Sequence, residues 1–142
     1  MKIIDASVLL YAFDIDSPKC LKAKDWIEDL YRTEDLVGLP RLVILAFVRI
    51  STNPRIMNIP SSPEAALGIV ETLTGHPKTR IVECGANHWK VFREVVSRSG
   101  VFGPSISDAF LASLAIEHGA TLCSCDEGFR RYPGLKFENP LA

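Results

Sequence analysis

Short apolar runs alternate with longer amphipathic segments along almost the whole chain. Runs of three or four residues in which Ile, Val or Leu predominate predict short strands. These runs lie at residues 2–4, 36–39, 80–82 and 121–123, and residues 135–137 predict a last strand at the edge of a sheet.

The segments between these runs carry apolar residues at helical spacing. Asn87 is expected to cap one helix, Ser105-x-x-Asp108 has the form of a capping box for another, and Gly119 is expected to end that helix. The predicted helices cover residues 6–13, 18–32, 40–52, 63–74, 87–98 and 109–117.

Alternation of strands and helices predicts right-handed crossover connections and a parallel sheet that is covered on both faces. We therefore expect a three-layer α/β/α fold whose central, mostly parallel sheet has about four to five strands. A length of 142 residues suits one domain, and no linker or internal repeat divides it, so residues 1–142 are expected to form a single domain.

Composition narrows the class of protein. A hydrophobic fraction of 47% with 23% charged residues is typical of a globular protein, and no apolar run is long enough to span a bilayer. The net charge of −1 argues against a protein that coats nucleic acid non-specifically. The N-terminus lacks a credible leader peptide, and the four cysteines lack the spacing of a zinc site, so we expect a cytoplasmic protein without membrane contact.

Three aspartates follow or precede strands at places that a parallel sheet would bring to one edge. Asp5 comes just after the first predicted strand, Asp126 just after the fourth, and Asp108 at the start of the helix before the fourth. Carboxylates gathered in this way repel one another unless a divalent cation compensates their charge. Oxygen ligands favour Mg²⁺ or Mn²⁺, so the sequence predicts a metal site at Asp5, Asp108 and Asp126.

Each aspartate also has a structural interpretation. Asp5 could cap the first helix, Asp108 could be the acidic member of the capping box, and Asp126 could be a turn residue. Taken together these interpretations are weaker, because capping does not require all three caps to share one end of the sheet.

The ordered set of acidic motifs resembles that of PIN-domain nucleases, and specifically the VapC group of toxins from type II toxin–antitoxin pairs. The opening motif is DASVLL (5–10), the third acidic motif is DAFLASLAIEHG (108–119), and the fourth lies within residues 120–129. TNPR (52–55) and ENPL (138–141) extend the resemblance over essentially the whole chain.

The resemblance implies a PIN-like fold and a Mg²⁺- or Mn²⁺-dependent endoribonuclease that hydrolyses RNA with Asp5, Asp108 and Asp126 as catalytic and metal-binding residues. It also implies a cognate VapB-like antitoxin as partner and a homodimer. Two family acids are absent, since Ala46 stands at the glutamate position of ILAFVR (44–49) and Gly128 stands two residues after Asp126. These gaps leave one well-supported metal, with the nucleic acid helping to bind another. Glu127 either substitutes for the missing acid or is a solvated turn residue.

Supporting roles fall to residues near the three acids. Ser7 and Ser124 match positions where the PIN-domain family often has a small hydrogen-bonding side chain near the acids. The resemblance implies that they hold a carboxylate or a metal-bound water, and simple capping of a helix or turn is the alternative. Arg49, one turn after Ala46, is expected to face the acids or a phosphate. Trp89 is expected to be a core residue.

Two classes of function remain open. The first is hydrolysis of the RNA backbone by in-line attack of water, which leaves a 5′-phosphate and a 3′-hydroxyl. The alternative is a catalytically weakened protein of the same fold that only binds RNA or a partner, and Ala46 is its best support. A dinucleotide-binding enzyme is disfavoured, because the first strand-to-helix turn has no glycine fingerprint.

Overall fold

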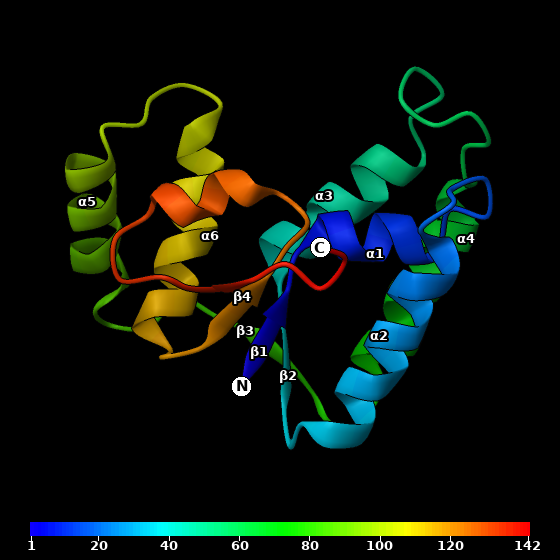
Figure 1. The fold of residues 1–142 in the computed structure, drawn as a ribbon, viewed down its shortest axis with the longest axis horizontal. Helices are drawn as coiled ribbons and strands as arrows, with labels where there is room; N and C mark the ends of the chain where they lie inside the picture. The colour runs from blue at the N-terminus through cyan, green and yellow to red at the C-terminus, as the bar shows by residue number, and fades with distance from the viewer.

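A computed structural model describes all residues, 1–142, and its centre is a parallel sheet of five strands in the order β3-β2-β1-β4-β5 (Figure 1). The strands are β1 (Lys2–Ile4), β2 (Val37–Pro40), β3 (Thr79–Val82), β4 (Thr121–Cys123) and β5 (Lys136–Glu138). All five predicted strands are present, and the expected three-layer α/β/α fold is confirmed.

Six helices cover the two faces of the sheet, with α5 and α6 on one side and α1 to α4 on the other (Figure 1). Their bounds are α1 (Ala6–Ala12), α2 (Cys20–Thr33), α3 (Arg41–Ser51), α4 (Pro63–Thr74), α5 (His88–Ser99) and α6 (Ser105–Glu117), and a 3₁₀ turn, η1 (Glu127–Arg131), follows β4. None of these helices has the length and apolar character needed to cross a membrane.

The core lies between the sheet and its helices. The sheet contributes Ile3, Ile4, Leu39 and Leu122 to the core, and each is at most 1% exposed. Such apolar strands are typical of a parallel sheet that is covered on both faces. Gly38 in β2 is needed for this packing, because a Cβ there would lie 2.8 Å from side-chain atoms of Ile3 and of Val82. The neighbouring strands therefore pack against the backbone of β2.

The start of α6 differs from the sequence-based prediction. The helix begins at Ser105, after Gly103 in the left-handed region (φ 58°) and Pro104 in helical conformation, and no side chain caps it. The predicted capping box is therefore wrong, because Ser105 already lies inside the helix. Asn87 does precede α5, but its side chain makes no capping hydrogen bond. Gly119 follows α6 with φ 63°, as a helix-ending glycine should.

Strand order places a topological switch point between β1 and β4. The chain moves from β1 through β2 to β3 on one side, then returns by α5 and α6 to β4 on the other side of β1. The two connections leave β1 and β4 in opposite directions, which opens a crevice at the carboxyl ends of these strands. Asp5 follows β1 and Asp126 follows β4, so both belong to this crevice.

Candidate active site

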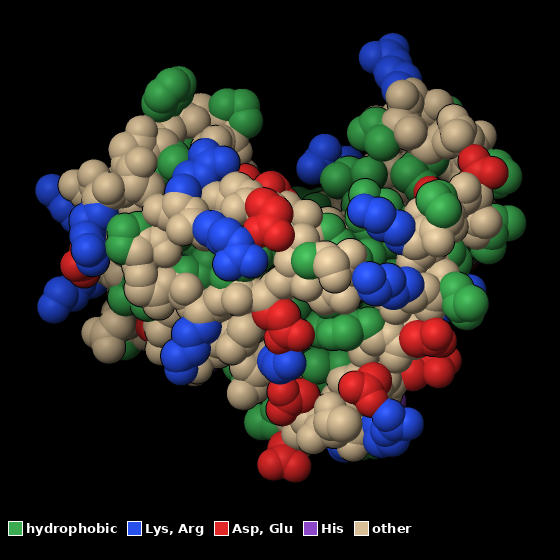
Figure 2. Space-filling view, in the orientation of Figure 1, with side chains coloured by type: hydrophobic (Ala, Val, Ile, Leu, Met, Phe, Trp, Pro, Cys, Tyr) green, Lys and Arg blue, Asp and Glu red, His purple; other side chains and the backbone are tan.

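A cavity of about 470 Å³ opens at the carboxyl edge of the sheet, and all three predicted aspartates line it. Asp5 enters from the β1–α1 junction, Asp108 from the first turn of α6 and Asp126 from the residue before η1. Figure 2 shows a hollow between the α5–α6 side and the α3 side of the molecule, with acidic side chains at its floor and Lys or Arg side chains on both flanks. The structure thus brings together residues that are more than 100 positions apart in the chain.

Asp5 is held by hydrogen bonds on both carboxylate oxygens. Its Oδ1 accepts a hydrogen bond from the backbone N–H of Ala6 at 2.8 Å, which caps α1. Its Oδ2 accepts from the hydroxyls of Ser124 at 2.6 Å and Ser7 at 3.1 Å. The capping interpretation is therefore correct for one oxygen, while the other belongs to a network at the crevice.

Ser7 and Ser124 join the two loops that form the crevice. Their hydroxyl oxygens lie 3.2 Å apart, and Ser7 Oγ also accepts the backbone N–H of Cys125 at 3.0 Å. The fully buried Ser124 Oγ accepts the backbone N–H of Asp126 at 3.0 Å. Both serines therefore orient the acids, and a substitution at either position should alter the geometry of both loops.

Asp126 and Asp108 are held less tightly than Asp5. Asp126 Oδ1 accepts the backbone N–H of Gly128 at 2.8 Å, as expected for a turn residue, and its Oδ2 has no hydrogen-bond donor in the protein. Asp108 accepts no hydrogen bond from the protein at all, because it lies within α6 and does not cap it. These oxygens are available to a ligand in the cavity.

Burial, together with electrostatic repulsion, raises the affinity of the site for protons. Burial raises the pKa of Asp5 above its usual value and the nearby Asp126 raises it further, against the opposing hydrogen bonds from Ser124, Ala6 and Ser7. Burial also raises the pKa of Asp108, to which the negative charges of Asp126 and Asp5 add. The cavity therefore favours any species that supplies positive charge.

The donor set fits a hard divalent cation. Carboxylate oxygens from three elements converge on one cavity, and their mutual repulsion is what a bound cation relieves. As the side chains stand, no three His, Cys, Asp or Glu residues are grouped tightly enough to hold an ion. Rotation of the Asp108 side chain toward the other two acids breaks no hydrogen bond within the protein, and a bound cation would offset the added repulsion.

One wall of the cavity comes from α3 and is mostly apolar. Leu42, Leu45, Ala46 and Ile50 line it, and Arg49 lies on the same helix face as predicted. A glutamate at position 46 would enter this cavity, so the absence of an acid there changes the charge of the site directly. The i, i+3, i+4 spacing of these residues was visible in the sequence, but it did not show that the stripe faces the acids.

Glu127 is not brought to the acids. It does not line the cavity, and its carboxylate instead accepts hydrogen bonds from Arg130 and from Asn139. These two hydrogen bonds lower the pKa of Glu127. Glu127 is thus a surface residue of η1 in this structure, which matches its interpretation as a solvated turn residue rather than as a substitute for the acid missing at Gly128.

The structure also corrects one prediction from the sequence and adds residues to the site. Trp89 is 69% exposed, so its assignment to the core is wrong. Ser107 and Phe129 line the cavity but were not singled out from the sequence. The side chain of Arg131 also lies near Asp126, since its Nη2 and Asp126 Oδ1 both approach the α-carbon of Gly128.

The chain is similar to known proteins over nearly its whole length. The family model described as PIN domain matches residues 2–135. The relative named Ribonuclease VapC43 from Mycobacterium tuberculosis is 35% identical over 141 residues, which cover 99% of this chain and 96% of that protein. Ribonuclease VapC31 from the same organism is 32% identical over 140 residues, covering 99% of each.

Solved structures share the fold at low sequence identity. VapBC2 from Rickettsia felis, bound to a DNA fragment from its promoter, superposes with a TM-score of 0.69 at 19% identity and covers 97% of each chain. VapC20 from Mycobacterium tuberculosis, a sarcin-ricin loop cleaving toxin, gives a TM-score of 0.65 at 13% identity, covering 96% of this chain and 99% of that one. With a family model that spans nearly the whole sequence and relatives above 30% identity, this chain belongs to the PIN domain family, in the group of the VapC ribonucleases.

Proposed function

We propose that this protein is a Mg²⁺- or Mn²⁺-dependent endoribonuclease and the toxin of a toxin–antitoxin pair. The observation that carries the proposal is the convergence of Asp5, Asp108 and Asp126 on one cavity at the switch point of a PIN-type sheet. Relatives named as ribonucleases, similar over nearly the full length, support the same reaction class.

The three carboxylates would together hold one cation. When bound, such a cation lowers the pKa of a coordinated water and neutralises negative charge on the phosphate under attack. With Ala46 and Gly128 in place of further acids, the chain offers the carboxylates for one ion. The raised pKa of Asp5 and of Asp108 means that protons compete with the cation at higher pH than they would at ordinary aspartates.

The remaining residues position the acids and the RNA. Ser124 and Ser7 fix the orientation of Asp5 through hydrogen bonds to Oδ2. Arg49 on α3 places a guanidinium in the cavity, where it can bind a phosphate oxygen of the RNA backbone. The apolar residues of α3 narrow the cavity on that side and restrict access of bulk water.

The reaction would be hydrolysis by in-line attack, leaving a 5′-phosphate and a 3′-hydroxyl. No side chain of the cavity is a histidine, so the site lacks the usual base for attack by the RNA 2′-hydroxyl. An unpaired RNA segment is the expected substrate, because a phosphate must enter a recessed cavity that a continuous duplex cannot reach.

We propose that a VapB-like antitoxin binds this chain, and the solved VapBC assemblies of similar fold support this partner. We further propose, from the family resemblance alone, that the chain forms a homodimer in the cytoplasm. Co-expression with a neighbouring short open reading frame, followed by size-exclusion chromatography with light scattering, tests both partners.

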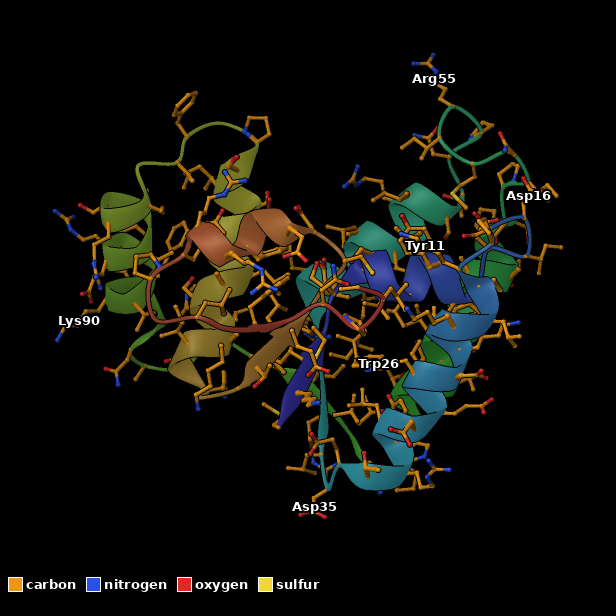
Figure 3. All side chains as sticks on the ribbon, viewed as in Figure 1. Tyr11, Asp16, Trp26, Asp35, Arg55 and Lys90 are labelled. Atoms are coloured by element: carbon orange, nitrogen blue, oxygen red, sulfur yellow. The ribbon has the colours of Figure 1, made fainter.

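The decisive experiment is cleavage of a defined RNA by purified protein, freed of antitoxin, with Mn²⁺ or Mg²⁺. Cleavage should stop with EDTA and in Asp108→Asn, and ligation-based mapping should find 5′-phosphate ends. Asp35→Asn is the matched control, because Asp35 is exposed on the loop before β2, far from the cavity (Figure 3). A chain that binds RNA but never cuts it under these conditions is a binding protein of this fold, and 2′,3′-cyclic ends would refute hydrolysis by water.

A further inference from the structure

Arg131 lies close to Asp126, beside the acidic cavity, and has no acidic partner. Its Nε donates a hydrogen bond to the backbone carbonyl of Gly128 at 2.8 Å, and its guanidinium lies 5.8 Å from the ring centroid of the buried Tyr132. The two terminal nitrogens make no other hydrogen bond and no ion pair in the protein. The side chain is therefore oriented by the protein, while its best donors remain free.

The guanidinium faces the acids closely enough to interact with them. Its Nη2 and Oδ1 of Asp126 both approach the α-carbon of Gly128, and no carboxylate lies within ion-pair distance of the guanidinium. An arginine that served only to neutralise the acids would pair with one of them directly, because the bidentate arginine–carboxylate pair is the strongest arrangement available. The space left between cation and acids suits an anionic group from outside the protein.

Gly128 permits this approach. A Cβ at position 128 would lie 2.7 Å from Nη2 of Arg131 and 2.9 Å from Oδ1 of Asp126, so both side chains converge on the bare α-carbon. The backbone of Gly128 is not in the left-handed region, so conformation alone does not require glycine there. The absence of a side chain instead lets the guanidinium approach the acidic cavity.

The neighbouring Arg130 shows what an arginine without this role looks like. Its guanidinium pairs with Glu127 and lies 4.8 Å from the ring centroid of Phe137, on the outer surface of η1. The two arginines are consecutive in the chain, but their side chains therefore lie in different surroundings.

From these contacts we propose that Arg131 binds a backbone phosphate of the RNA at the acidic cavity, donating from its terminal nitrogens to non-bridging oxygens. Together with Arg49 from α3, it supplies positive charge on the substrate side of a site that lacks two acids. This inference rests on the proposed RNA substrate, and it gives Gly128 a purpose, because a side chain there would displace the guanidinium.

The test measures RNA binding without catalysis. Affinity for a fluorescein-labelled single-stranded RNA is followed by anisotropy in EDTA over a series of salt concentrations. Arg131→Ala should weaken binding about tenfold and reduce the slope of log affinity against log salt by about 0.7, the loss of one phosphate contact to a single strand. Arg131→Lys should keep the slope and recover part of the affinity, since it retains the charge but not the planar fork.

Controls separate the possible failures. Arg130→Ala should leave both affinity and slope as in the unmodified protein, and circular dichroism should show each variant folded. If Arg131→Ala does not fold, Arg131→Gln tests the same contact, because it removes the charge and the planar fork while it keeps most of the side-chain stem. An unchanged slope in folded Arg131→Ala, or an equal loss in Arg130→Ala, overturns the role of Arg131 while leaving the nuclease intact. Absence of both RNA binding and metal-dependent cleavage in the unmodified chain overturns the proposed function itself.

Discussion

Replacement of Ser124 by alanine should weaken both the fold and the acidic site. The Ser124 hydroxyl is fully buried, donates to Asp5 Oδ2 at 2.6 Å and accepts the backbone N–H of Asp126 at 3.0 Å. Alanine removes both contacts while changing the volume of the side chain little. Asp5 keeps its hydrogen bonds from Ser7 and from Ala6, so its carboxylate is not left without donors.

The cost follows from these two contacts. A hydrogen bond to a charged group contributes about 1.5–3 kcal/mol, and a backbone N–H left without an acceptor costs about 1–3 kcal/mol. Because Ser7 can still donate to Asp5, we expect a net loss in the free energy of unfolding of about 2–3 kcal/mol. For a chain of this size that loss corresponds to a fall in Tm of about 6–9 °C.

The same change should move the pH dependence of the site. The hydrogen bond from Ser124 lowers the pKa of Asp5, so its removal raises that pKa further. The carboxylate then ionises at higher pH, and cation binding and cleavage should require higher pH. The stability deficit should be largest where Asp5 is ionised and should shrink as pH falls through its folded pKa.

Thermal unfolding in EDTA, followed by circular dichroism, and Mn²⁺ titrations between pH 5 and pH 8 measure the two effects. Ser113→Ala is the matched control, because Ser113 is equally buried but bonds within α6 and to His88, away from the acids. It should lower Tm without moving the pH dependence of cation binding. A Tm of Ser124→Ala within about 1 °C of the unmodified protein, or an unmoved pH dependence, would refute the reasoning.

Three further predictions concern the charge of the cavity. Asp108→Asn should abolish cleavage yet stabilise the metal-free protein at pH 7 by up to about 1 kcal/mol, measured by urea unfolding, because it removes a charge that burial and the neighbouring acids disfavour, without breaking a hydrogen bond. The metal-free protein should gain stability from these acids as pH falls through the raised pKa of Asp5 and Asp108 toward the ordinary aspartate value, since the folded state binds these protons more tightly than the unfolded state; if Asp108→Asn leaves the pH dependence of the urea midpoint unchanged in this range, the prediction is wrong. Ala46→Glu should strengthen Mn²⁺ binding at least severalfold and lower metal-free stability, and unchanged calorimetric affinity would show that position 46 does not reach the ion.

Hydrophobic periodicity predicted the fold well because a covered parallel sheet leaves a simple pattern. The strands at residues 2–4 and 121–123 are buried on both faces, and the helices between them alternate apolar and polar faces. The start of α6 was misplaced because Ser105-x-x-Asp108 imitates a capping box. The chain there enters the helix through Gly103 and Pro104 instead, which leaves the Asp108 side chain free.

The candidate site was predictable as far as strand ends could locate it. Asp5 and Asp126 follow adjacent parallel strands, so topology alone brings them together. The direction of a side chain on a short turn could not be predicted from the sequence in this way. The 3₁₀ geometry of η1 turns Glu127 toward Arg130 and Asn139, and spacing along the sequence carried no sign of it. The difference between Arg130 and Arg131 was hidden for the same reason.

The central claim is that Asp5, Asp108 and Asp126 share one cation, and calorimetric titration of the purified chain with Mn²⁺ tests it most directly. We predict binding of one ion per chain at pH 7.5, lost in Asp108→Asn and retained in Asp35→Asn. Binding of equal strength in the unmodified protein and in Asp108→Asn, or no binding to the unmodified protein at millimolar Mn²⁺, would contradict it.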